Sequence, residues 1–250
     1  MKNSKVKSLE KLDVVKHNDL IQADWLDDFT LFDQQFISAC ISQISMDDED
    51  FEDTIIDAKE LFKRINGYEL RGEKRELYYK NLLLLMKKRI RIKSKLTPHG
   101  EHTFVWFTHV YNDDETGEMK VTFNQSLKKF LLNLDGDFSK TKFIRHLNSK
   151  KSFGLKIYQV MNRLSSPAME KKFKISEIKE MLNLQGVYSR IYDFKKYVID
   201  PAIEDINSFA EFTLTYEQQK VGRKVVYIKF IKHNRESLDE HKPVDFMKGH

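Results

Sequence analysis

Residues with the types and spacing of known catalytic motifs occur at several places, and each place lacks a part that the chemistry needs. No two of the eight histidines are two residues apart, so the His-x-His metal pair of a DNA-nicking site is missing. His99 and His102 are three apart in a predicted loop. Gly67 and Gly72 have the spacing of a phosphate-binding loop, but Glu73 follows where that loop needs a lysine. ATP binding through this motif is therefore excluded.

Two further clusters fail for similar reasons. Ser165-Ser166 has neither a nucleophile elbow nor a placed histidine. The acidic run at residues 47–53 lacks the glycine and ligand spacing of a calcium loop, which favours a solvated linker. The single cysteine, Cys40, permits no internal disulfide or Cys-based zinc site and lies in an apolar helical pattern, so we expect a small core residue. The sequence thus predicts no catalytic residues, no metal, no cofactor and no enzyme.

Charged residues are distributed unevenly along the 250 residues. The chain carries a net charge of +5, yet residues 1–60 sum to −9, residues 61–100 to +9 and residues 141–250 to +8. An acidic opening repels phosphates, so we expect it to face solvent or a basic partner. Local basic segments of this kind are typical of proteins that bind nucleic acid.

The sequence predicts neither a membrane span nor a secretory signal. Hydrophobic residues make up 40% of it, but no run approaches the roughly 20 apolar residues of a membrane span. The polar residues 1–9 do not read as a secretory signal. We therefore expect a cytoplasmic protein without a membrane partner.

The first half of the chain reads as helix, short strand, brief helix, long helix and hairpin. Thr30 precedes the first helical pattern, and Asp57, with Glu60 three residues later, reads as the cap of the brief helix. The predicted segments are a helix over 31–44, a strand over 54–56, a brief helix over 57–67, a long helix from near Leu70 to Leu85, and strands over 89–93, 104–111 and 119–123. The strand over 89–93 alternates basic and apolar residues and predicts a basic face.

The second half repeats this order. Ser176 reads as the cap of the brief helix, and the distance from cap to glycine is ten residues in both halves, Asp57 to Gly67 and Ser176 to Gly186. The predicted segments are a helix over 153–164, a short run over 173–175, a brief helix from Ser176 to near Gly186, a long helix over 188–207, and strands over 211–216 and 224–231 around a turn at 218–222.

This plan is that of a winged helix-turn-helix, present twice, and we predict an α+β fold of two tandem winged-helix domains. The predicted boundaries are a flexible arm over 1–13, a first domain over 14–135, a second over 136–235 and a flexible tail over 236–250. The alternative is a coincidence in a generic α+β protein.

A helix-turn-helix places the N-terminal part of its second helix in the major groove. At 100° per residue, the apolar residues of the 188–207 helix gather on one side and the polar residues of its first turns on the other. The predicted inner residues are Tyr188, Ile191, Phe194, Val198, Ala202 and Ile206, and the outer ones are Ser189, Arg190, Asp193, Lys196 and Tyr197, with Lys195 at the margin. Pro201 must kink or restart the helix, so the DNA-facing part is expected to end near Tyr197.

Further DNA contacts are predicted at the second wing and in the first unit. Lys220, Arg223 and Lys224 cluster at the tip of the second hairpin, where the alternative is a solvated loop. Basic residues also begin the first long helix and follow it on the next strand. They are Arg71, Lys74 and Arg75 on the helix, and Arg89, Arg91, Lys93 and Lys95 after it. That helix is apolar almost all round over 82–86, so the sequence does not show which of its sides is exposed.

Three motifs resemble one known family. Residues 188–207 read YSRIYDFKKYVIDPAIEDIN, residues 220–224 read KVGRK, and residues 15–20 read VKHNDL. On these motifs, which span residues 14–231, the chain resembles the iteron-binding replication initiators of theta-replicating plasmids.

The resemblance implies two winged-helix domains that grip a repeated origin sequence as a monomer. It also implies that a dimer joined through the first domain represses the protein's own gene, in plasmid copy control. The implied partners are double-stranded DNA at origin repeats and operator, a homodimer in equilibrium with monomer, a host replication initiator and the replicative helicase. Principal base contacts are implied at positions matching Arg190, Lys196 and Tyr197. Some relatives carry arginines where this chain has Lys195-Lys196-Tyr197, and lysine lacks the bidentate fork that reads guanine.

Two other functions stay open at this point. One keeps the fold but makes the protein a dimeric transcriptional repressor without a role in initiation. The other is a scaffold in which both winged helices bind proteins. Support of an origin in a host that lacks the protein separates initiator from repressor, and absence of salt-sensitive DNA affinity favours the scaffold.

Overall fold

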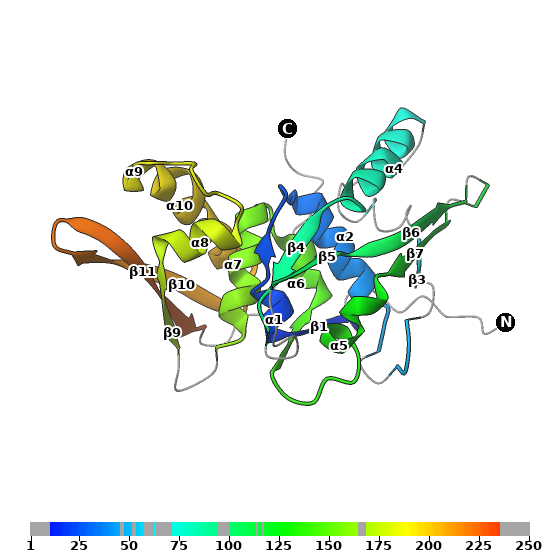
Figure 1. Cartoon of the computed structure of the whole chain (residues 1–250), viewed down its shortest axis with the longest axis horizontal. Coiled ribbons are helices and arrows are strands. Elements are labelled where there is room, and N and C mark those ends of the chain that lie inside the picture. The colour runs from blue at the N-terminus through cyan, green and yellow to red at the C-terminus, as the bar shows by residue number, and fades with distance from the viewer. Residues whose placement is uncertain are drawn as a thin grey trace.

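The computed structural model contains short helices and four small antiparallel sheets arranged along one long axis (Figure 1). It describes residues 11–45, 48–51, 54–57, 63, 72–94, 101–113, 115–116, 118–164 and 169–235. Residues 1–10 of the predicted arm and the predicted tail over 236–250 lie outside these ranges, while Leu12 is buried and Asp13 begins the first strand.

The first part of the chain begins with three short elements that were not predicted, and the described elements after them follow the predicted order. Its elements are β1 (Asp13–His17), α1 (Asn18–Ile21), β2 (Asp24–Trp25), α2 (Leu31–Ile41), β3 (Thr54–Asp57), α4 (Glu73–Leu85), β4 (Arg89–Ile92), β5 (His102–Val105), β6 (Phe107–Asn112), β7 (Glu118–Phe123), η2 (Gln125–Leu127) and α5 (Lys128–Leu131). Thr30, which precedes the predicted helix, caps α2 in a capping box with Asp33. Cys40 is fully buried, as predicted. The predicted brief helix over 57–67 lies outside the described residues except for Asp57, which ends β3, and Lys63.

The second part repeats the plan. Its elements are β8 (Phe138–Lys142), α6 (Phe143–Asn148), α7 (Ser152–Asn162), β9 (Glu170–Lys174), α8 (Ile175–Met181), α9 (Ile191–Phe194), the π-helical turn η3 (Lys195–Ile199), α10 (Asp200–Phe209), β10 (Phe212–Val221) and β11 (Lys224–Asn234). The predicted cap at Ser176 is wrong. Lys174 precedes the helix, and its backbone N–H donates to the Glu177 carboxylate at 2.8 Å.

The predicted strand over 104–111 is two strands that belong to different sheets. β5 pairs with β4 in the sheet β2-β4-β5, whereas β6 pairs with β7 in the sheet β3-β7-β6. The chain leaves one sheet for the other at Trp106, which is buried and whose carbonyl accepts from the Asn124 N–H at 2.9 Å. An unbroken apolar run, Phe104 to Phe107, crosses the break, so the sequence pattern alone could not reveal it.

A single apolar core extends through both halves, and the strand pair β1-β8 joins the first element to residues beyond the predicted boundary at 135. Helix α7 packs against α2 on one side and against α10 on the other. The β10-β11 hairpin and α9 lie at one end of the long axis, and α4 with the β6-β7 hairpin lies at the other (Figure 1). The two winged-helix units therefore present separate ends of one body.

Two lysines are buried where the halves meet. The Lys16 ammonium donates to Gln159 Oε1 at 2.6 Å, and that of Lys156 donates to the carbonyls of Ile21 and Ala23, both at 2.8 Å. Burial lowers the pKa of each lysine to about 7, because removal from water penalises the charged form.

These lysines predict a pH dependence of stability. The pKa of lysine in the unfolded chain is about 10.5, so between pH 7 and 10.5 the unfolded state binds more protons than the folded state. Stability therefore rises with pH in this window, by on the order of 1 kcal/mol per pH unit for each lysine. Urea unfolding from about pH 7 to 9 should show a smaller rise for Lys16→Met than for the wild type. Equal slopes would mean that Lys16 titrates normally.

Candidate nucleic-acid interface

The predicted recognition helix is one continuous helical segment from α9 through η3 to α10. It begins at Ile191 and ends at Phe209, not at residues 188 and 207. Tyr188 has a left-handed backbone with φ of 54°, which is incompatible with a right-handed helix at this position. Ser189 and Arg190 therefore precede α9. The predicted inner face is confirmed, since four of its residues are buried: Phe194, Val198, Ala202 and Ile206. The other two, Tyr188 and Ile191, are partly buried against the core.

Pro201 restarts the helix as predicted, without breaking it. Proline has no N–H for the carbonyl four residues back, and its ring crowds that carbonyl. The preceding turn widens instead, so that the Asp200 N–H donates to the Lys195 carbonyl five residues earlier. A π-helical turn of this kind is a frequent feature of functional sites. Here it carries Lys195, Lys196 and Tyr197.

The predicted contact residues of this helix lie on its exposed side. Arg190 is 82% exposed even though its Nε is 2.9 Å from the Asp193 carboxylate. Ser189, Lys196 and Tyr197 are exposed as well. Lys195 is only partly exposed, and its ammonium lies 5.6 Å from the centre of the Tyr216 ring, which agrees with its predicted place at the margin.

The sequence reading missed Tyr192, which is the most exposed large apolar side chain in the described residues at 67%. It lies in the first turn of α9, four residues before Lys196, so the two side chains share one face. An exposed aromatic ring beside basic groups at the start of a recognition helix suits contact with a thymine methyl or a base edge. Its neighbours Ile191 and Phe194 belong to the apolar inner face, and their pattern alone does not indicate an exposed ring at Tyr192.

The second wing is longer and its turn tighter than predicted. β10 extends to Val221 and β11 begins at Lys224, so that the turn consists of Gly222 and Arg223. Gly222 has φ of 61°, a conformation that glycine adopts without strain. The predicted contacts Lys220, Arg223 and Lys224 are all exposed at this tip, and within residues 169–235 none of them forms an ion pair.

The predicted contact residues of the first unit differ in their exposure. Arg71 lies outside the described residues, and α4 begins at Glu73 after Gly72. Lys74 is exposed, but the Arg75 guanidinium donates to the Asp113 carbonyl at 2.7 Å and is partly buried. The inner face of α4 consists of Tyr78, Leu82 and Leu85, while Leu77 and Leu84 are exposed.

The prediction of a basic DNA face on the strand after α4 is wrong. Arg89 forms a bidentate pair with Asp27, at 3.0 Å for both contacts, and Lys88 pairs with Asp33. Arg91 and Lys93 both contact Asp24 and Glu180, while Lys95 lies outside the described residues. The acidic opening thus neutralises the basic segment of the same chain.

One group of side chains in the described part of the chain has the types and proximity of metal ligands. His17, Asp19 and Asp137 could bring three ligand atoms together. However, His17 Nδ1 already accepts the Asp19 N–H at 3.1 Å in the cap of α1, and Asp19 also accepts from Ser94. Within the same residues, no helix has both the length and the apolar character to cross a membrane.

Comparison with known proteins identifies the family. The model described as "Initiator Replication protein, WH1" matches residues 13–162, and that described as "Initiator Rep protein, WH2" matches residues 174–231. A crystal structure of the Pi initiator protein in complex with iteron DNA superposes with a TM-score of 0.71 at 16% identity, covering 91% of this chain and 99% of that one. Domains 2 and 3 of RctB give a TM-score of 0.47 at 12% identity, covering 88% and 82%. The chain therefore belongs to the initiator replication proteins and has their two tandem winged-helix domains.

Proposed function

We propose that the protein binds double-stranded DNA sequence-specifically at repeated sites, the iterons of a plasmid origin, and there starts plasmid replication. It acts by binding and not by catalysis. As a dimer it represses its own gene, and at the origin it recruits a host initiator and the replicative helicase. The Pi initiator, whose fold this chain shares, was solved with iteron DNA, which supports the choice of ligand.

The observation that carries the proposal is the contrast between two basic segments. On β4 and beside it, Lys88, Arg89, Arg91 and Lys93 are each paired with a carboxylate, which neutralises their charge within the fold. On the second unit, Lys196 and the wing residues Lys220, Arg223 and Lys224 are exposed and have no carboxylate partner in the described ranges. Cations that are exposed and unneutralised attract phosphate, and release of DNA counterions drives such binding.

The proposal predicts tight, selective and salt-sensitive DNA binding. A duplex carrying the repeats beside the protein's own gene should bind at least about 1,000-fold more tightly than a scrambled duplex of equal length. Affinity for both should fall as salt rises from about 50 to 200 mM, with a log-log slope of about −0.9 per contacted phosphate. Titration by fluorescence anisotropy measures both quantities. Equal, salt-independent affinity for the two duplexes would instead favour the protein scaffold.

Initiator and repressor are separated by a test in cells. A plasmid that carries the repeats but not the gene should replicate only when the protein is supplied from elsewhere in the host. Repression of the gene's promoter without support of that plasmid would leave a repressor with no role in initiation.

A further inference from the structure

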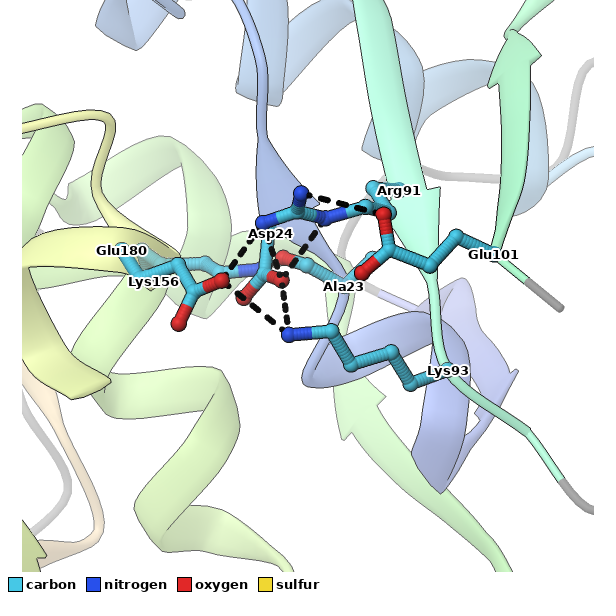
Figure 2. Close-up of polar contacts among 7 residues, drawn as sticks. All are labelled: Ala23, Asp24, Arg91, Lys93, Glu101, Lys156 and Glu180. Carbon is cyan, nitrogen blue, oxygen red and sulfur yellow. Dashed lines mark hydrogen bonds and ion pairs between the residues drawn. The ribbon is translucent and has the colours of Figure 1, made fainter.

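The second helix-turn-helix is connected to the first unit by a compact cluster of charges, here called the bridge: Asp24, Arg91, Lys93 and Glu180. Arg91 Nη2 lies 2.6 Å from Glu180 Oε1 and 3.2 Å from Asp24 Oδ2. Lys93 Nζ reaches the same two oxygens at 3.1 and 3.2 Å. Figure 2 shows both cations converging on both carboxylates, with Glu101 on the outer side of Arg91 at 3.3 Å. The bridge is thus a shared network and not a set of separate pairs.

The members of the bridge come from elements that are far apart in the sequence. Asp24 begins β2, Arg91 lies on β4 and Lys93 follows β4, whereas Glu180 lies on α8, the first helix of the second helix-turn-helix. Arg91 and Lys93 are two residues apart, and alternate residues of a strand point to the same side. Asp24 and Arg91 are only 13% and 19% exposed, so solvent screens their interaction less than it screens a surface pair.

Asp24 and Arg91 of the bridge are held firmly by their backbone. The buried Lys156 ammonium donates to the carbonyl of Ala23, the residue before Asp24, at 2.8 Å (Figure 2). Asp24 and Arg91 are also direct partners in the β2-β4 pairing. Movement of the cations relative to Asp24 would therefore require the sheet to deform.

Two more polar contacts cross between the units on the same side. Lys171 on β9 donates to Gln22 Oε1 at 3.1 Å, and Asn183, just after α8, donates to Asp28 Oδ1 at 3.0 Å. The part of the second unit that meets the first here is β9, α8 and the start of the turn before the recognition helix. Hydrogen bonds and ion pairs weaken steeply with distance and angle, whereas apolar packing is non-directional. The polar contacts therefore restrict the relative position of the two units more strictly than apolar packing does.

We propose that the bridge sets the offset between the two winged-helix units, and with it the distance in base pairs between the DNA segments that each unit contacts. This inference rests on the proposed function. Glu180 and Arg91 are positioning residues in this reading, because they act on spacing through α8 and do not touch DNA themselves. Loss of the bridge leaves the recognition surface intact but allows the units to adopt a range of offsets.

The test compares Glu180→Gln with the matched control Glu204→Gln. Both changes remove one negative charge from the second unit, but Glu204 is exposed on α10 and forms no hydrogen bond or ion pair with the described residues of the first unit. The probes are the repeat duplex and a version with one base pair inserted between the two contacted segments. Wild type and the control should lose at least tenfold in affinity on the inserted duplex, and Glu180→Gln threefold or less. Equal losses in all three proteins would overturn the proposal.

A second readout needs no DNA. Spin labels at Thr108→Cys and Gln185→Cys report the distance between the units in the full chain, since both positions are exposed and the native Cys40 is fully buried. The distance distribution should be narrow in the otherwise wild-type chain and in Glu204→Gln, and broader in Glu180→Gln. A distribution unchanged by Glu180→Gln would contradict the bridge. Absence of selective DNA binding with a broadened distribution would instead overturn the proposed function alone.

Discussion

Replacement of Gly154 by alanine is expected to lower the free energy of unfolding by about 2 to 3 kcal/mol, as overpacking of a filled core does. A Cβ at Gly154 would lie 2.5 Å from Asp205 Oδ2 and 3.2 Å from Asp205 Cβ. In most helices the same change is favourable, because alanine has the higher helix propensity. The sign of the effect is therefore a direct test of the contact between α7 and α10.

The Asp205 carboxylate cannot move aside cheaply, because it connects the start of α7 to α10. It accepts from Ser149 Oγ at 2.7 Å, from the Lys150 N–H at 2.8 Å and from the Lys151 N–H at 3.2 Å. The Asp205 side chain is buried, so turning the carboxylate out would cost these three hydrogen bonds.

A double-mutant cycle separates the clash from any general damage to α7. Asp205→Ala should itself be destabilising, since it leaves buried donors unpaired. In that background Gly154→Ala should cost nothing or stabilise slightly, because the obstructing carboxylate is gone. Chemical denaturation of the four proteins gives the comparison. An equal cost of Gly154→Ala with and without Asp205 would show that the clash is not its cause.

Asp205 also illustrates a signal that the sequence carries for a buried acid. Two acidic residues, Glu204 and Asp205, lie beyond Asp200 on the recognition helix. Asp205 is seven residues after the buried Val198 and three after the buried Ala202, so it falls within the apolar stripe. A carboxylate in such a stripe indicates a buried acid with several donors. Glu204, one residue earlier, is exposed.

Features that depend on local chemistry were predictable from the sequence. The cap at Thr30, the inner face of the recognition helix and the restart at Pro201 follow from neighbouring residues and appear in the structure. The glycine of the second wing lies at the turn for the same reason, because a positive φ is needed there.

Features that depend on distant partners were not predictable in this way. The strand over 89–93 was interpreted as a DNA face because its own residues are basic. Its partners Asp24 and Asp27 precede it by more than 60 residues, and Glu180 follows by almost 90. The opposite charges of residues 1–60 and 61–100 were the available signal that these segments neutralise each other. The division of residues 104–111 between two sheets likewise depends on β4 and β7.

The second large effect concerns the recognition helix. Arg190→Ala combined with Lys196→Ala is expected to weaken binding to the repeat duplex by about 100-fold, because a side chain that reads a base contributes roughly 1 to 3 kcal/mol. Both side chains are exposed, so the fold should not change. The control is Lys128→Ala with Lys129→Ala, which removes two positive charges from α5, on the other side of the molecule from α9 (Figure 1). Anisotropy titrations should be accompanied by thermal unfolding of each protein.

The pattern of loss then tells which contacts the two side chains make. If they read bases, the ratio of affinities for repeat and scrambled duplex should collapse, as the proposal expects for a major-groove helix. If they contact only phosphates, both affinities should fall together and the salt slope should drop by about 2. Arg190 has a further constraint, because it must leave Asp193 to reach a base, and the carboxylate then repels the phosphates nearby. Undiminished selective binding by the variant would move the recognition surface to the first unit, where Lys74 and Arg75 begin α4.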